Sequence, residues 1–293
     1  MTNIFETLRS LGLTSESTKV IYSEETRDVS PLRVFKDSVS GVIFIDSYYT
    51  GEDTYKKGGY RKDKTVINVH TCNPDHERNA DADRRVSDFN QFYTGKRIAD
   101  FGCGDGEFLK RTRHLVSSSV GIELEEDYVE ALNSDGINCV QSLTEIDNGS
   151  LDVMFSFHTL EHLPNPIDFL TEMRNKLTEG GIIVVEVPHA SDFLLSHIKS
   201  DEFKKFTLWS QHLVLHTRDS LNRLLTSTEF KDVIIQGVQR YPLSNHLNWL
   251  AFGKPGGHKS KLSTIDSSEL HSAYEAALQR IDSTDTLIAI AKK

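Results

Sequence analysis

From residue 97 to the C-terminus, short apolar runs alternate with segments in which apolar residues recur at helical spacing. This alternation is typical of consecutive strand-helix units and predicts a parallel β-sheet covered by helices. The predicted strands are 97–101, 119–123, 138–140, 151–157, 182–187, 231–239 and 285–291. The predicted helices are 107–116, 126–134, 166–177 and 218–226, and Gly180-Gly181 is expected to supply the left-handed C-cap of the third helix.

The first 92 residues have a different pattern and are predicted to form an appendage to a main domain at 93–293. Apolar residues at helical spacing predict a short N-terminal helix with Ile4, Phe5, Leu8 and Leu11 on one face. Strand-like runs follow at 18–22 and 31–35, and the runs 32–35 and 42–45 predict a hairpin around the turn 37–41. The tyrosine- and glycine-rich stretch 48–61 is expected to be a surface loop or a lid.

Charge and composition narrow the class of protein. The 293 residues are 38% hydrophobic and 26% charged, with a formal net charge of −10. An acidic chain lacks the basic footprint that nucleic acid or anionic lipid requires, so we expect neither as a partner. We find no apolar run long enough for a membrane span and no signal peptide, and therefore expect a cytoplasmic protein. The three cysteines are predicted to be reduced thiols: Cys72, Cys103 and Cys139.

A glycine-rich turn at 100–106, DFGCGDG, follows the first strand of the main domain and precedes a helix. Glycines at 102, 104 and 106 let backbone groups approach a ligand without obstruction by Cβ atoms. Glu123 ends the next strand, where a carboxylate can accept hydrogen bonds from ribose hydroxyls. The spacing G-x-G-x-G differs from the G-x-G-x-x-G of nicotinamide sites, which argues against an NAD dehydrogenase.

With these motifs the chain resembles the class I S-adenosylmethionine (SAM)-dependent methyltransferases. The resemblance rests on IADFGCGDGEFL, GIELEEDY, LDVMFSFHTLEHLPNPIDFL and LTEGGIIVVEVPH, in that order. It implies a doubly wound α/β fold with a seven-stranded, mostly parallel sheet, an antiparallel last strand and an insertion at 240–284. It also implies SAM as cofactor and S-adenosylhomocysteine (SAH) as product, held by Asp100, Gly102, Cys103, Gly104, Gly106, Glu123, Ser142, Leu143, Phe157 and His158. In this set Glu123 would hold the ribose, Ser142-Leu143 would flank the adenine, and Phe157 and His158 would face the methionine end.

Histidines near the predicted strand ends are candidates for a general base, because methyl transfer to a hydroxyl requires removal of a proton. We rank His162 and His212 first and His158 next. The segment 158–162 spells H-x-x-E-H, but it straddles a strand end and precedes Pro164, so it cannot form the helix of a zinc protease. Ubiquinone-type O-methyltransferases are similar here, with E-x-x-E-H as a possible metal site. His158 departs from that pattern, and we expect no resident metal.

Sugar methyltransferases are also similar, with a Glu-His pair where this chain has Gln211-His212. The stretch 240–260 mixes aromatic, amide and cationic residues, as would suit a hydroxylated, anionic acceptor. Within it, 253–260 approaches a phosphate-binding P-loop, but His258 replaces a required glycine. The leading hypothesis is therefore methylation of a small polar acceptor, a sugar or sugar-derived group of a bacterial surface polysaccharide. The alternatives are a ubiquinone-type aromatic O-methyltransferase and a SAM-binding partner subunit without turnover.

Overall fold

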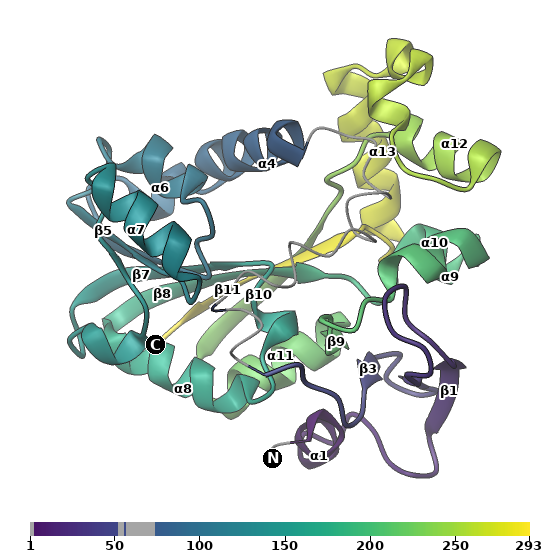
Figure 1. Ribbon diagram of the computed structural model, residues 1–293, viewed down its shortest axis with the longest axis horizontal. Coiled ribbons are helices and arrows are strands. Elements are labelled where there is room, and N and C mark those ends of the chain that lie inside the picture. Colours follow the sequence, from purple (N-terminus) through teal and green to yellow (C-terminus); the bar gives the residue numbers. More distant parts are fainter. Residues whose placement is uncertain (1–2, 52–55, 57–73) are drawn as a thin grey trace.

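A seven-stranded sheet with helices on both faces forms the centre of the computed structural model, which describes residues 3–51, 56 and 74–293 (Figure 1). The strand order is β10-β11-β8-β7-β4-β5-β6, and β11 runs antiparallel to both of its neighbours while the other pairs are parallel. The strands are β4 (Arg97–Phe101), β5 (Ser118–Ile122), β6 (Cys139–Val140), β7 (Leu151–Phe157), β8 (Leu177–Pro188), β10 (Lys231–Val238) and β11 (Thr286–Lys292). The predicted doubly wound α/β fold is confirmed.

Each face of the sheet has its own apolar core. On one face, α8 (Pro166–Lys176) and α11 (Arg218–Ser227) bury leucines against the strands. On the other face lie α6 (Glu107–Thr112) and α7 (Glu126–Ser134), where an aromatic cluster fills the core. The alternation of buried strands with one-sided helices is what the hydrophobic pattern predicted.

The glycine pair after α8 does not cap that helix, and this prediction was wrong. The helix ends at Lys176, its C-cap Leu177 is already extended, and β8 begins there. Gly180 has φ of 74° within the span of β8, next to a register irregularity between β8 and β7. The left-handed glycine thus bends the start of a strand, a role that a sequence pattern does not distinguish from a helix cap.

The N-terminal segment forms a second, smaller sheet of order β1-β2-β3-β9. Its strands are β1 (Lys19–Ser23), β2 (Val34–Asp37), β3 (Ile43–Ile45) and β9 (Val214–Leu215), and α1 (Ile4–Ser10) packs on it. The antiparallel β2-β3 hairpin is confirmed. β9 was not predicted, and it joins the appendage to the segment that precedes α11. A bridge between His189 and His216 then connects this segment to the end of β8.

Two helices before β4 were also missed: α4 (Pro74–Asp88) and α5 (Asn90–Tyr93). The α4 sequence PDHERNADADRRVSD is almost entirely polar, and its fully or partly buried apolar positions, Ala82 and Val86, are too few to signal a helix. Phe89 and Tyr93 anchor this region in the aromatic core. Most of the tyrosine-rich stretch 48–61 lies outside the described residues.

The remaining helices extend the carboxyl-end side of the large sheet. After β8 come α9 (Phe193–Ser196) and α10 (Asp201–Thr207), and after β10 come α12 (Leu243–Phe252), the 3-10 helices η4 (Gly257–Lys259) and η5 (Lys261–Ile265), and α13 (Ser268–Arg280). Two further 3-10 helices, η2 (Leu143–Glu145) and η3 (Leu160–His162), follow β6 and β7. Within the described ranges no helix combines the length and apolar character that crossing a bilayer requires.

Candidate active site

The glycine-rich turn connects β4 to α6 at the carboxyl edge of the sheet. All three of its glycines have positive φ: 76° at Gly102, 56° at Gly104 and 71° at Gly106. A Cβ at Gly102 would lie 2.2 Å from Thr159 Oγ1, and one at Gly106 would lie 2.5 Å from Leu132 Cδ2. Two of the glycines are thus required by packing within the protein, beyond any need for a ligand to approach.

Glu123 follows β5 and supports the turn. Its Oε2 accepts a hydrogen bond from the Gly104 N–H at 2.8 Å, and its Oε1 accepts one from the Glu125 N–H at 3.0 Å. A carboxylate has about four lone-pair positions, so these two bonds leave acceptor capacity for hydroxyl groups. The side chain thus couples the turn to the neighbouring strand and could also bind a ribose.

Asp100, the residue before Phe101 at the end of β4, is buried. Among the described residues its Oδ1 has no hydrogen-bond partner. Burial raises the pKa of Asp100 to about 7, with further contributions from the charges of Glu123 and Asp105. An orphaned buried carboxyl oxygen beside a glycine-rich turn is a feature that a bound polar ligand would satisfy.

Four other predicted cofactor residues make contacts within the protein itself. The Ser142 side chain caps η2 and accepts a hydrogen bond from the Thr144 N–H, while Leu143 is buried in the core. The Phe157 ring stacks on Phe89 in the aromatic core. Cys103 is buried within the turn itself.

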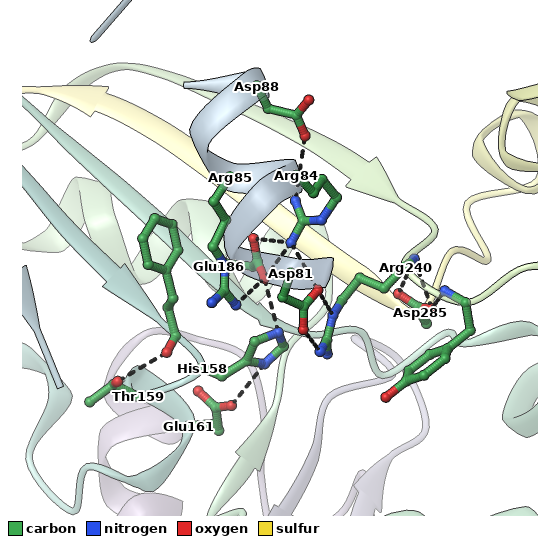
Figure 2. Close-up of polar contacts among 12 residues, drawn as sticks. Asp81, Arg84, Arg85, Asp88, His158, Thr159, Glu161, Glu186, Arg240 and Asp285 are labelled. Carbon is green, nitrogen blue, oxygen red and sulfur yellow. Dashed lines mark hydrogen bonds and ion pairs between the residues drawn. The ribbon is translucent and has the colours of Figure 1, made fainter. Parts of the chain in front are cut away.

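His158 lies just beyond β7 in a left-handed conformation, with φ of 51°. Figure 2 shows its ring between two buried carboxylates. Nδ1 is 3.3 Å from Glu161 Oε1, and Nε2 is 3.1 Å from Glu186 Oε1. Burial and the charge of Arg240 oppose protonation, but the bonds to Glu161 and Glu186 prevail and raise the pKa of His158. The raised pKa favours the protonated imidazole, and both ring nitrogens face carboxylate oxygens.

Glu186, on β8, also pairs with two arginines of α4 (Figure 2). Arg84 Nη2 lies 2.8 Å from both carboxylate oxygens, and Arg85 Nη2 lies 2.7 Å from Oε1. Burial disfavours the charge of Glu186, but Arg85, His158 and Arg84 hold its pKa well below the usual range. The hydrophobic pattern missed this cluster, and the only signal for it was the Arg84-Arg85 pair in a polar segment.

Arg240 connects the same cluster to the insertion. It pairs with Asp81 of α4, and its backbone N–H donates to Asp285, the residue before β11. The two ends of the insertion and the helix α4 therefore meet beside Glu186 and His158 (Figure 2). A buried set of paired charges of this kind is costly to disrupt, because removing one partner leaves another charge unpaired.

A second group of side chains surrounds His162, the last residue of η3. Its Nδ1 is 2.8 Å from the Gln211 carbonyl oxygen, which can only accept, so Nδ1 carries the proton and the Nε2 lone pair is basic. Nε2 lies 4.0 Å from Glu161 Oε1. The His162 ring packs against Trp209 and His212, with ring centroids 5.8 and 5.1 Å away. This places the two first-ranked histidines side by side.

His212 differs in charge from His158. Burial, helped by the positive charge of His162, lowers the pKa of His212 to about 3, so its imidazole is neutral. Burial raises the pKa of Glu161, but the hydrogen bond to His158 and the nearby imidazoles of His162 and His158 outweigh it and bring that pKa to about 2. Glu161, His162 and His212 each offer a ligand atom, all within 4.8 Å of one another. The group could hold a metal ion as well as act on a proton.

The insertion uses its amides to support its own loop. Asn245 Oδ1 accepts a hydrogen bond from the Gly256 N–H at 2.9 Å, and Asn248 Nδ2 donates to the Lys254 carbonyl at 2.7 Å. The P-loop-like stretch 253–260 therefore packs on α12. The ring of His258 is held near Tyr241, with centroids 5.6 Å apart.

Known proteins share this fold and part of this sequence. The family model of the methyltransferase domain matches residues 75–234, more than half of the chain. A crystal structure of a SAM-dependent methyltransferase from Archaeoglobus fulgidus superposes with a TM-score of 0.51 and 20% identity, covering 73% of this chain and 94% of that one. The likeness to that structure concerns the fold.

Two curated relatives match over shorter segments. The ubiquinone biosynthesis O-methyltransferase of Glaesserella parasuis serovar 5 (strain SH0165) is 27% identical over 105 residues, which are 31% of this chain and 44% of that protein. The tRNA U34 carboxymethyltransferase of Haemophilus influenzae (strain PittEE) is 31% identical over 108 residues, 31% of this chain and 32% of that protein. The chain thus spans less than half the length of these relatives.

Proposed function

The chain belongs to the methyltransferase domain family, and we propose that it transfers a methyl group from SAM to a small polar acceptor. The acceptor we favour is a sugar or sugar-derived group of a bacterial surface polysaccharide, methylated in the cytoplasm without a nucleic-acid partner. The observation that carries the proposal is the position of His162 beside Glu161 and His212 at the carboxyl edge of the sheet. Ligands of open α/β sheets bind at this edge.

The turn 100–106 and Glu123 would hold SAM. Gly102, Cys103, Gly104 and Gly106 would present backbone groups to the methionine portion, and Glu123 has acceptor capacity left for the ribose. The orphaned Oδ1 of Asp100 would find a hydrogen-bond partner in the bound cofactor. When bound, SAM supplies an electrophilic methyl group. Support for adenine contacts by Ser142 and Leu143 is weaker, because one is engaged as a helix cap and the other is buried.

His162 would remove the acceptor proton. The Gln211 carbonyl fixes its tautomer, so Nε2 is the basic atom, and Glu161 would stabilise the imidazolium that forms. His212 has a pKa too low for an efficient base at neutral pH and would act as a neutral neighbour. His158, whose ring nitrogens face Glu161 and Glu186, would position these two carboxylates rather than take up the acceptor proton.

The surroundings of these histidines support a polar acceptor. Arg240 is buried close enough to act on the charge of His158, and the Tyr241 ring lies beneath its guanidinium, 5.5 Å from the centroid. On the other side, Trp209 offers an aromatic surface beside His162. Aromatic rings with charged and amide groups suit a hydroxylated ligand that carries negative charge.

A ubiquinone-type aromatic acceptor is the second candidate. It is favoured by the 27% identity to a ubiquinone biosynthesis O-methyltransferase and by a small apolar pocket near His212, lined in part by Ile43, Leu208 and Trp209. A third candidate is a partner subunit that binds SAM without turnover.

The test is a screen for SAH release from SAM, with nucleotide sugars, free saccharides and polyhydroxylated aromatic compounds as acceptors. We expect SAH with at least one saccharide, at a rate that depends on His162. SAH formed only with aromatic acceptors would replace the sugar with the second candidate. SAM binding without SAH release on any acceptor would favour the partner subunit.

A further inference from the structure

Two thiols lie side by side beneath the glycine-rich turn. Cys103 lies in that turn, two residues after the end of β4, and Cys139 is the first residue of β6. Both are buried, with 9% and 4% of their surfaces exposed, and their Sγ atoms are 3.9 Å apart. The distance is close to van der Waals contact, so the two sulfurs face each other with no atom between them.

A glycine in the neighbouring strand provides the space for this pair. Gly121 of β5 pairs with Asp100 of β4 on one side and with Cys139 of β6 on the other. A Cβ at this position would lie 2.6 Å from the Cys103 sulfur and 3.2 Å from the Cys139 sulfur. Any side chain at 121 would therefore displace the sulfurs.

A hydrogen bond between the two thiols shifts their pKa values in opposite directions. The hydrogen bond from Cys103 lowers the pKa of Cys139, despite the opposing effect of burial. The same bond, together with burial, raises the pKa of Cys103. Cys139 is thus the more readily ionised of the two, and the thiolate is the nucleophilic form of cysteine.

From this geometry we propose that Cys103 and Cys139 are an oxidisable dithiol that hydrogen peroxide converts to a disulfide. The Cys139 thiolate attacks one peroxide oxygen, the O–O bond breaks, and a sulfenic acid forms as hydroxide leaves and takes up a proton. The Cys103 sulfur then attacks the Cys139 sulfur and expels water. The two thiol hydrogens, together with both hydrogens and both oxygens of the peroxide, end as two water molecules, and each sulfur is oxidised by one electron.

The disulfide would act on the turn rather than on the sheet. A disulfide bond is about 2.05 Å long, so the sulfurs must approach by roughly 1.9 Å. Cys139 is held by its strand pairing, whereas Cys103 lies outside the strands, in the turn between Gly102 and Gly104. The movement would strain the bond from the Gly104 N–H to Glu123. On the proposed function, which this step assumes, oxidation weakens SAM binding.

The test uses the full chain and two readouts. After treatment with hydrogen peroxide and blocking of remaining thiols, intact mass and peptide mapping without reductant should show loss of two hydrogens and a peptide linking 103 to 139. The variant Cys72→Ser should behave the same, since it removes the only other cysteine. In Cys139→Ser no intramolecular link should form. Calorimetry should show SAM binding about tenfold weaker or more in the oxidised protein, as expected for the loss of one charged hydrogen bond.

Reduction with dithiothreitol should restore the affinity. A link that involves Cys72, or oxidation of Cys72 with no link at all, would overturn the dithiol assignment. A 103–139 link with unchanged SAM affinity would overturn its effect on the turn. Failure of the reduced protein to bind SAM would count against the proposed function instead, because the mass readout does not depend on SAM.

Discussion

The two halves of the candidate site are built in different ways. The turn 100–106 and Glu123 come from one β-α-β unit, and their contacts join residues close in sequence. The histidine half combines η3, the segment before β9, α4 and both ends of the insertion. One half is a local motif and the other is a product of tertiary folding. We therefore expect changes in the first to act on cofactor affinity, and changes in the second on turnover or on stability.

The histidine half should show the largest effect on turnover. His162→Asn is expected to lower kcat by about 10²–10⁴ with SAM affinity nearly unchanged, because general-base catalysis acts in the transition state. The rate of the parent protein should rise with pH through a single ionisation. Steady-state kinetics with the best acceptor of the screen measures both, and exposed His114→Asn is the control.

His212→Asn separates the two neighbouring histidines. It should lower kcat less than His162→Asn, and the reverse order would move the base to His212. Dialysis against EDTA should leave kcat unchanged, since we assign proton removal to a side chain. Loss of activity on EDTA treatment, restored by a divalent cation, would make Glu161, His162 and His212 a metal site and contradict that assignment.

Changes in the turn 100–106 should alter the affinity for SAM. Gly104→Val should weaken SAM binding by about a hundredfold or more, because a branched side chain would keep the cofactor from approaching the backbone of the turn. It also forces a β-branched residue into positive φ, which costs roughly 1–2 kcal/mol of stability. Gly136→Val is the matched control, with φ of 75° and open space around it. Calorimetry should find normal SAM affinity in the control. Equal losses in both variants would show that strain alone explains the effect.

Buried histidines also make the free energy of unfolding depend on pH. Burial lowers the pKa of His246 to about 4, and His189, His212 and His216 are likewise buried and neutral. The unfolded chain protonates these residues below about pH 6.5, so the free energy of unfolding should fall as pH drops from 6.5 to 4. Glu161 and Asp81, with pKa values of about 2, lose their contribution only at lower pH.

Urea titrations at pH 7 and pH 5 measure this loss. In His246→Gln, the loss of unfolding free energy between pH 7 and pH 5 should be smaller by roughly 2 kcal/mol. In exposed His114→Gln, the loss should equal that of the parent protein. An equal loss in His246→Gln and the parent protein would mean that His246 is already charged in the folded state.

The contrast between local contacts and contacts of distant segments also explains which features could be predicted from sequence. The strands 97–101 and 151–157 and the helix 126–134 were predicted to the residue, because each combines a clear hydrophobic period with a recognisable start. The hairpin followed from a local turn signal, and the seven-stranded sheet with its antiparallel last strand followed from the family resemblance. These features depend on neighbours in the chain.

Features that depend on distant partners were missed. The segment PDHERNADADRRVSD buries Ala82 fully and Val86 partly, too weak an apolar pattern to reveal α4, whose ion pairs include Arg84 with Glu186. The two-residue strand β9 exists only because β3 pairs with it. Likewise, the sequence did not indicate that Glu186, which lies far from His158 along the chain, contacts its imidazole.

Thermal unfolding with added nucleotide ligands tests the central claim most directly. A ligand that binds only the folded state stabilises it by RT ln(1 + [L]/Kd), about 1.4 kcal/mol at ten times Kd. SAH should raise the melting temperature of the parent protein, and NAD at the same concentration should not. Gly104→Val should show no shift with SAH, and Gly136→Val should keep it. A shift with NAD and none with SAH would contradict the assignment of the turn 100–106 to SAM.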